Sequence, residues 1–459
     1  MSLEFKYYKI NDIGEVVSGG TPSTSKNEYW YGDIGWITPK DLSSYDDIYI
    51  SRGERNISSE GLNNSSAKLV PKNTVLMTSR APIGYIAIAN NELSTNQGFK
   101  SLICNEKICH YKYFYYWLKL NIKYIINNSN GSTFKEISGG TFKNLELSLP
   151  SLNEQKAISS VLWTIDEKIS VLKRINKNLE ELMHVLFKKY FIDSNPFYVE
   201  NDENWNIIKL KDLIIRNRDK INDFDNWKDE LLIDLSNMPR FSIAISNFDK
   251  GKKFTSNIYK LNKYDLLFGS IRPYFGKVGF SPINGVVTGT VHSFKPIDDI
   301  YYSLVLSLIS SKTFINYTVS VSKGTKMPSV KWDDFINYEF AIPDDLSKIG
   351  EYNKILLPLI HKIEKNILEI QRLTKLRDTL LPKLMSGEID VSKINCDLKI
   401  IIRKIYIKSS KLFLWRYLSE NKNYIKNTKS NETLLKSRTI YKINKFLAKF
   451  NARYRYYRQ

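Results

Sequence analysis

Residues 149–190 read LPSLNEQKAISSVLWTIDEKISVLKRINKNLEELMHVLFKKY, and apolar side chains recur in this stretch in alternating steps of three and four. That period places them along one side of an α-helix and is typical of a helix that packs lengthwise on a partner. The positions of this seam are Leu162, Ile165, Ile169, Leu172, Asn176, Leu179, Met183, Leu186 and Tyr190. Because one amphipathic helix cannot bury its own apolar stripe, the sequence predicts a second long helix.

A seam of the same kind returns 194 residues later in the chain. Its positions are Leu356, Leu359, Ile363, Asn366, Ile370, Leu373, Arg377, Leu380 and Leu384. If the two helices run antiparallel, Asn176 and Asn366 form a buried polar pair that sets the register; the alternative is that each asparagine lies at a solvated edge. Pro358 predicts a kink or a late start of the second helix, and Pro382 predicts a bend near its end.

The segments before each long helix also resemble one another. The run Tyr8-Lys9-Ile10-Asn11-Asp12-Ile13 returns as Ile208-Lys209-Leu210-Lys211-Asp212-Leu213. Gly131, Phe142 and Pro150 return 193 residues later as Gly324, Phe335 and Pro343. These repeats indicate a tandem duplication of a globular part followed by a long helix.

The globular parts read as mixed and strand-rich, because short β-branched and aromatic runs alternate with Gly, Pro, Asn and Ser. The expected strands are 75–77, 85–89, 145–149, 265–268, 277–280 and 338–342, and one helix is expected in each part, at 111–126 and 301–317. The predicted fold class is α+β, with two tandem strand-rich domains and two long helices packed as an antiparallel coiled coil with pseudo-two-fold symmetry. The predicted boundaries are 1–150 for the first domain, 151–193 for the first long helix, 194–208 for a linker, 209–343 for the second domain, 344–390 for the second long helix and 391–459 for a basic tail.

Composition excludes several classes of protein. The 459 residues carry 68 Lys and Arg against 48 Asp and Glu, a net charge of +20, but residues 391–459 alone hold 18 of these cations against 3 of the anions. A polyanion-binding argument from total charge therefore applies mostly to the tail. No stretch reaches the roughly 18 apolar residues of a membrane span, and three cysteines form no disulfide framework, so we expect a cytoplasmic protein.

Motifs for catalysis are missing from the sequence. There is no phosphate-binding Gly-x-x-x-x-Gly-Lys-Ser/Thr loop, no dinucleotide-binding glycine pattern and no His-Glu-x-x-His pair. Cys104, Cys109 and His110 have a weak metal-ligand spacing, for which ordinary burial is the favoured interpretation. Asn195-Pro196-Phe197-Tyr198 resembles the loop with which amino-methyltransferases hold a flipped base, but a turn between helix and domain is favoured. The expectation is a chain without catalytic or metal-binding residues.

What remains is binding by basic and amide side chains in Gly- and Pro-rich loops. Arg and Lys suit guanine edges and phosphates, and Asn and Gln suit adenine edges. The alternative for each single residue is ordinary surface charge. The candidate DNA-binding residues are Arg80, Asn96, Gln97, Lys100, Arg272, Lys277, His292, Lys323 and Lys326.

Several stretches are typical of one known family. They include Gly19-Gly20-Thr21-Pro22-Ser23, Trp36-Ile37-Thr38-Pro39-Lys40, Thr95-Asn96-Gln97-Gly98-Phe99-Lys100, Phe268-Gly269-Ser270-Ile271-Arg272-Pro273-Tyr274, Leu149-Pro150-Ser151-Leu152-Asn153-Glu154-Gln155 and Leu380-Leu381-Pro382-Lys383-Leu384-Met385-Ser386-Gly387-Glu388. Over residues 5–390 the chain resembles the specificity subunit of a type I restriction–modification system. That resemblance implies a non-catalytic DNA reader in which each domain binds one half of a split target.

The same resemblance implies partners. The paired helices would set the gap between the half-targets and dock two methyltransferase subunits, which restriction and translocase subunits would join. No cofactor is expected on this chain, because S-adenosylmethionine, ATP and Mg²⁺ would belong to the partner subunits. The second junction, Pro343-Asp344-Asp345-Leu346, lacks the Glu-Gln of the first, and the tail has no expected counterpart. A methyltransferase or nuclease with its own recognition domains and a structural scaffold are the rival interpretations, and the DNA target cannot be read from the sequence.

Overall fold

The computed structural model describes residues 4–43, 45, 47–131, 135–192, 205–253 and 257–391, all of which belong to one compact unit. Most of the expected linker 194–208 and the tail 392–459 lie outside the described residues, as does the Asn195–Tyr198 turn. Below, the first half means residues 4–150 and the second half means residues 205–343.

Each half is built from short strands and a few helices. The first half holds β1 (Lys6–Lys9), β2 (Gly14–Ser18), β3 (Trp30–Ile37), β4 (Tyr49–Ile50), β5 (Asn56–Ile57), β6 (Leu69–Val70), β7 (Val75–Ser79), β8 (Ile83–Ala89), β9 (Leu93–Thr95), β10 (Lys100–Cys104) and β11 (Glu146–Leu149), with α1 (Pro39–Leu42), α2 (Ser59–Asn63), α3 (Tyr111–Asn127) and α4 (Gly139–Asn144). The second half holds β12 (Trp205–Lys209), β13 (Ile214–Arg216), β14 (Leu231–Ile233), β15 (Asp249–Lys250), β16 (Ile258–Leu261), β17 (Leu266–Gly269), β18 (Val278–Phe280), β19 (Gly285–Thr288), β20 (Val291–Pro296) and β21 (Glu339–Pro343), with α6 (Tyr302–Ser310), α7 (Lys312–Ser320) and α8 (Trp332–Ile336). The expected strands are confirmed to within two residues at each end, and the helix expected over 111–126 is confirmed as α3.

Sheet order repeats between the two halves. The strand that opens each half pairs antiparallel with the strand that closes it, β1 with β11 and β12 with β21. The central sheets have the orders β2-β10-β7-β8-β4 and β13-β20-β17-β18, and the outer sheets have the orders β5-β3-β9-β6 and β15-β14-β19-β16. The repeated sequence runs form the same turn, in which Asp12 or Asp212 accepts a hydrogen bond from the backbone N–H of Lys9 or Lys209. The internal resemblance read from sequence therefore extends to topology.

One helix prediction is wrong, and one of the two alternatives for Pro358, the late start, is ruled out. The helix expected over 301–317 is two helices, because Ser311 is extended and its hydroxyl accepts from the Phe314 N–H to begin α7. The second long helix, α9 (Leu346–Met385), does not start late at Pro358 but runs through both prolines. Contacts of its first turns with α6 stabilise that start, since Tyr352 donates to Ser307 at 2.8 Å.

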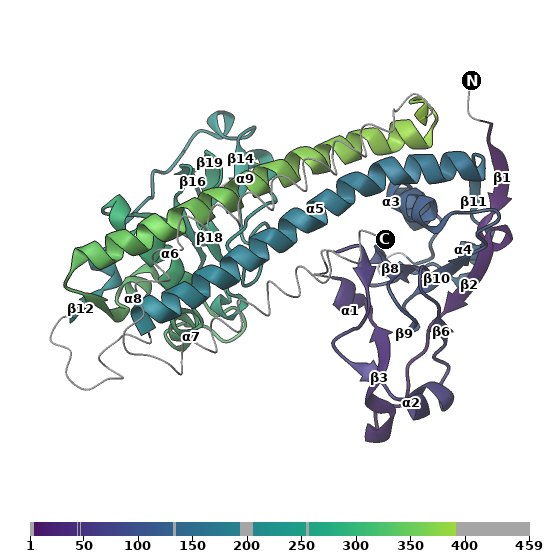
Figure 1. Cartoon of the computed structure of the whole chain (residues 1–459), viewed down its shortest axis with the longest axis horizontal. Coiled ribbons are helices and arrows are strands. Elements are labelled where there is room, and N and C mark those ends of the chain that lie inside the picture. The colour runs from purple at the N-terminus through teal and green to yellow at the C-terminus, as the bar shows by residue number, and fades with distance from the viewer. Residues whose placement is uncertain are drawn as a thin grey trace, which may run out of the picture. The chain divides into compact units, whose positions relative to one another are not determined.

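The long helices α5 (Leu152–Phe187) and α9 lie side by side and run antiparallel (Figure 1). Lys168 forms an ion pair of 2.6 Å with Glu369, and nearer the other end Tyr190 packs on Tyr352. The seam positions Leu162, Ile165, Ile169, Asn176, Leu179, Leu359, Ile363, Asn366 and Ile370 are buried, and Leu172, Leu186, Leu373 and Leu380 are half-buried. The apolar stripe of each helix is thus covered by the other helix and by the two halves.

Asn176 and Asn366 are hydrogen bonded to each other in the middle of the helix pair. The Asn366 amide donates to the Asn176 side-chain oxygen at 2.7 Å, and the two residues are 2% and 3% exposed, respectively. This is the paired arrangement, not the solvated one. An amide pair has a partner only in one register, so it specifies how the helices align.

Buried polar contacts attach the first half to this pair. Asp166 on α5 accepts 2.7 Å hydrogen bonds from the Tyr116 hydroxyl of α3 and from the Arg377 guanidinium of α9. Burial and the Asp166 charge hold the pKa of Tyr116 well above its usual value, so its hydroxyl stays a donor. Gln155 adds a second contact, donating to the Ile108 carbonyl at 2.9 Å.

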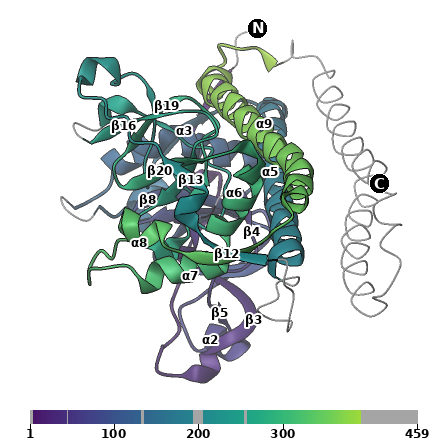
Figure 2. The same cartoon turned by 90° about the vertical axis from the view of Figure 1, so that its left-hand side faces the viewer.

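The second half is attached to both helices. On α9, the buried Glu364 accepts from the Tyr264 hydroxyl and pairs with Lys263, each at 2.6 Å. On α5, Glu180 accepts from the Ser242 hydroxyl and the Ile243 N–H. Helix α6 also packs against both long helices (Figure 2). The two halves therefore contact different stretches of one helix pair.

The asparagine pair gives the first testable prediction. Asn176→Leu alone leaves the Asn366 amide buried without a partner, which costs about 1–3 kcal/mol of stability. The double variant N176L/N366L removes both polar groups and should be at least as stable as the wild type. Thermal melting of the single and double variants beside the wild type tests this; a double variant destabilised by the sum of the single effects would contradict it.

Arg377 provides a comparison within one side chain, because it contacts Asp166, which is 4% exposed, and Asp378, which is 58% exposed. Asp166→Asn should cost about 3–5 kcal/mol, since it removes the buried charge partner of a half-buried guanidinium and leaves only the exposed Asp378. Asp378→Asn should cost under about 1 kcal/mol, because water screens the exposed carboxylate. Melting curves measure both, and similar losses would show that burial of the ion pair is not what matters.

Candidate nucleic-acid interface

In each half, a central strand ends beside a loop that carries a glycine of positive φ. After β7, Arg80 bridges to Glu136 across the loop that contains Gly131, whose φ is 94°. After β17, Ile271 bridges in the same way to Ser329, across the loop of Gly324, whose φ is 107°. An L side chain rarely adopts this conformation, so glycine is needed at both turns. The two loops are structural counterparts.

Basic side chains gather at this place in the first half. The guanidinium of Arg80 lies 3.4 Å from the Glu136 carboxylate. Lys100, on the neighbouring strand, is 8% exposed, and burial lowers the pKa of its ammonium, with the Arg80 charge acting in the same direction. Both cations therefore lie at one spot, and Glu136 partly balances them.

The loop between β9 and β10 brings amides to the same spot. The Asn96 side-chain oxygen accepts from the Gly98 N–H at 2.9 Å, and a Cβ added to Gly98 would lie 3.0 Å from that oxygen and 3.7 Å from Arg80 Nε. Gln97 is exposed and accepts a hydrogen bond from the Thr21 hydroxyl. The structure thus brings Arg80, Asn96 and Lys100 together, with Gln97 at the surface beside them.

In the second half, the predicted residues separate into an exposed group and an engaged group. Lys323 and Lys326 are exposed on the Gly324 loop. Arg272 has a φ of 52° and donates its backbone N–H to the Pro328 carbonyl at 2.7 Å. Its Nε is buried and has no acceptor among the described residues. These three cations surround one loop.

His292 and Lys277 have partners inside the second half. The ring Nε2 of His292 donates to the Val330 carbonyl at 3.1 Å, and burial lowers the pKa of the ring to about 4, so the imidazole is neutral at pH 7. The Lys277 ammonium donates to the Leu235 carbonyl, and burial, then the Arg240 charge, lowers its pKa. Neither side chain presents an unengaged charge at the surface.

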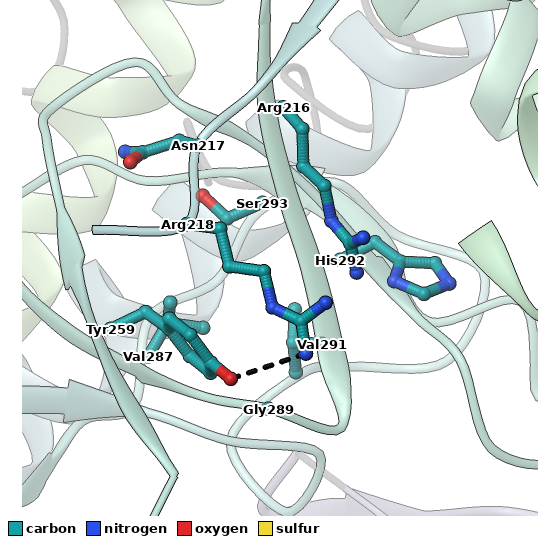
Figure 3. A pocket seen from close by; sticks show the side chains of 9 residues that line it. All are labelled: Arg216, Asn217, Arg218, Tyr259, Val287, Gly289, Val291, His292 and Ser293. Carbon is teal, nitrogen blue, oxygen red and sulfur yellow. Dashed lines mark hydrogen bonds between the residues drawn. The ribbon is translucent and has the colours of Figure 1, made fainter. Parts of the chain in front are cut away.

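Sequence reasoning missed two arginines that lie beside His292. Arg216 ends β13 with its guanidinium 4.6 Å from the centre of the Trp332 ring, and Arg218 donates to the Tyr259 hydroxyl at 3.2 Å (Figure 3). The candidates were basic and amide residues in loops that recur in both halves. The repeat aligns Arg216 and Arg218 with Val16 and Ser18 of the first half, which carry no charge. Their own signal is the Arg-Asn-Arg run at the end of a strand.

Taken together, the exposed guanidinium, ammonium and amide groups suit the phosphates and base edges of a nucleic acid. No three His, Cys, Asp or Glu side chains of the described residues are grouped as a metal site, and Cys104 and Cys109 are free thiols. Within the same part of the chain, no helix combines the length and hydropathy that crossing a membrane requires. The structure therefore presents groups that can bind a nucleic acid on two corresponding surfaces, one around Arg80 and one around Arg272.

Comparisons with known proteins identify the family. Residues 3–181 match the family model of the type I restriction modification DNA specificity domain. The chain is 36% identical over 413 residues to the type I restriction enzyme MjaIX specificity subunit of Methanocaldococcus jannaschii, a match that covers 84% of this chain and 94% of that protein. It is 25% identical over 187 residues to the type I restriction enzyme HindI specificity subunit of Haemophilus influenzae, 39% of each chain.

A solved structure shares the fold. The type I restriction–modification S subunit from M. genitalium superposes with a TM-score of 0.53 at 17% sequence identity, covering 83% of this chain and 96% of that one. At that identity the match supports a shared fold and nothing more. The sequence relationship to the M. jannaschii protein spans most of both chains, and on it the protein belongs to the family of type I restriction enzyme specificity subunits.

Proposed function

We propose that this specificity subunit reads a two-part DNA target, one part with each half of the chain. The observation that carries the proposal is the pair of corresponding clusters, around Arg80 in the first half and Arg272 in the second, held on one antiparallel helix pair. Two binding surfaces on a rigid support can contact only two sites at a set separation. On this proposal, residues 1–150 and 209–343 are the recognition domains.

The helices α5 and α9 would set the unread gap between the two parts of the target. Their alignment is specified by the Asn176–Asn366 pair, and the buried contacts of Asp166 and Glu364 hold the halves against them. The exposed faces of the two helices would dock two methyltransferase subunits, which restriction and translocase subunits would join. S-adenosylmethionine, ATP and Mg²⁺ would act on those partners, and this chain would be a non-catalytic reader.

Within each surface, the exposed candidates are the better-placed contacts. Gln97 and Asn96 have the chemistry to read adenine edges, and Arg80, Lys323 and Lys326 have the chemistry to bind guanine edges or phosphates. Lys277 and His292 are engaged with backbone carbonyls, so on the present proposal they support the surface from within.

An exchange of one half tests the proposal. The chain is co-expressed with the methyltransferase subunit encoded beside it, in a host without other adenine methylation, and modified bases are mapped by single-molecule sequencing. The expected result is a two-part motif with a constant gap. Replacing residues 209–343 with the corresponding segment of a relative should change one part of the motif and leave the other part and the gap unchanged.

Two outcomes would contradict the proposal. A stable copurified complex without sequence-specific methylation would favour a structural scaffold. A segment exchange that changes both parts of the motif at once would mean that the halves do not read separately. Specific binding should exceed non-specific binding by about 10³ or more, which a duplex competition experiment measures directly.

A further inference from the structure

The positions of Arg216 and Arg218 indicate a binding role that the internal repeat does not predict. Arg216 ends β13, the edge strand of its sheet, and Arg218 follows two residues later; the two side chains line one small pocket together with Tyr259 and His292. Figure 3 shows both side chains beside His292 and Val291. Arg218 is exposed and Arg216 is half-buried, so a ligand can reach both guanidinium groups.

The charge of this pair is not balanced by an ion pair within the described residues. No carboxylate of that part of the chain pairs with either guanidinium, whereas Arg80 has Glu136 and Arg377 has Asp166. Burial lowers the pKa of Arg216, and the charge of Arg218 lowers it further, so both effects disfavour the Arg216 cation. Tyr259 and the Asp333 carboxylate act in the opposite direction and do not cancel these effects. A bound anion would relieve both of them.

The two guanidinium groups are held in place before any ligand arrives. Arg216 lies over the Trp332 ring, and Arg218 lies 5.2 Å from the centre of the Tyr259 ring while donating to its hydroxyl. Stacking on an aromatic face restricts the side chain, so less conformational entropy is lost when it binds. The N–H groups that remain form a fork suited to phosphate oxygens.

We propose that Arg216 and Arg218 form a phosphate-binding site that holds the DNA backbone beside the base-reading loops of the second half. Base edges present neutral acceptors, so only the phosphodiester chain supplies the negative charge that two adjacent cations require. The site would add a DNA-backbone contact to the proposed reading of the target, and the inference rests on that proposed function. The site makes the halves unlike, because the first half has Val16 and Ser18 at the corresponding positions.

The test compares salt dependence in the complex of the full chain with its methyltransferase subunits. The variants are Arg216→Gln, Arg218→Gln and the double substitution, and Lys211→Gln, an exposed lysine of the same half, is the charge-matched control. Binding is measured by fluorescence anisotropy at several salt concentrations, with the duplex identified by methylation mapping and with a random duplex of equal length. Each lost phosphate contact should reduce the slope of log K against log salt by about 0.9.

We expect the double variant to lose about 1–2 units of slope on both duplexes, with an unchanged methylation motif, and the control to keep the wild-type slope. An unchanged slope, or a motif relaxed at one base pair, would overturn the phosphate site even if the wild type reads its target. If the wild type shows no sequence preference but the slope still falls, the proposed function fails and the phosphate site stands. Arg218 is exposed, so Arg218→Gln alone carries the test if loss of the Arg216–Trp332 contact unfolds the half.

Discussion

The hydrogen bond between Asn176 and Asn366 is the contact on which the rest of the structure depends. Hydrophobic burial brings α5 and α9 together, but apolar side chains alone tolerate a shift of one turn along the seam. A buried amide tolerates no such shift, because the slipped helix pair would leave both side chains without partners. The two residues come from the two copies of a duplicated sequence, so this one contact also specifies how the copies face each other.

The two halves take their places from buried carboxylates on the helices. Asp166 joins α3, α5 and α9 at one point. At another point, Glu364 accepts a hydrogen bond from Tyr264 and forms an ion pair with Lys263. A tyrosine donates to a carboxylate in each case, yet the cation comes from the partner helix at Asp166 and from the second half itself at Glu364. The duplicated scaffold therefore uses the same kind of attachment with different residues, which allows the binding surfaces to diverge without loss of the support.

Sequence predicted the parts of this architecture that depend on local periodicity. The seams and the strand positions follow from residue spacing within short windows, whereas the asparagine pairing was one of two alternatives that this spacing left open. The helix over 301–317 was wrong because Ser311 starts a new helix with its own cap, and Pro358 did not delay α9 because Tyr352 holds the preceding turns on α6. The surface at Arg216 and Arg218 depends on contacts with Tyr259 and Trp332, far along the chain, and the same is true of the buried ring of His292. Spacing carries no signal for such contacts.

The central claim is that the helix pair measures the distance between two reading surfaces, and a change of its length tests that claim most directly. One heptad is inserted at the same level in both helices, after Ser170 in α5 and after Gln371 in α9, between the attachments of the two halves. Seven residues lengthen a helix by about 10.5 Å and turn it through almost two full turns, so the faces of both halves are kept. At about 3.4 Å per base pair, the account predicts the same two half-motifs with a gap longer by about three base pairs in the methylation map. An active complex that modifies the original motif with its original gap would contradict it.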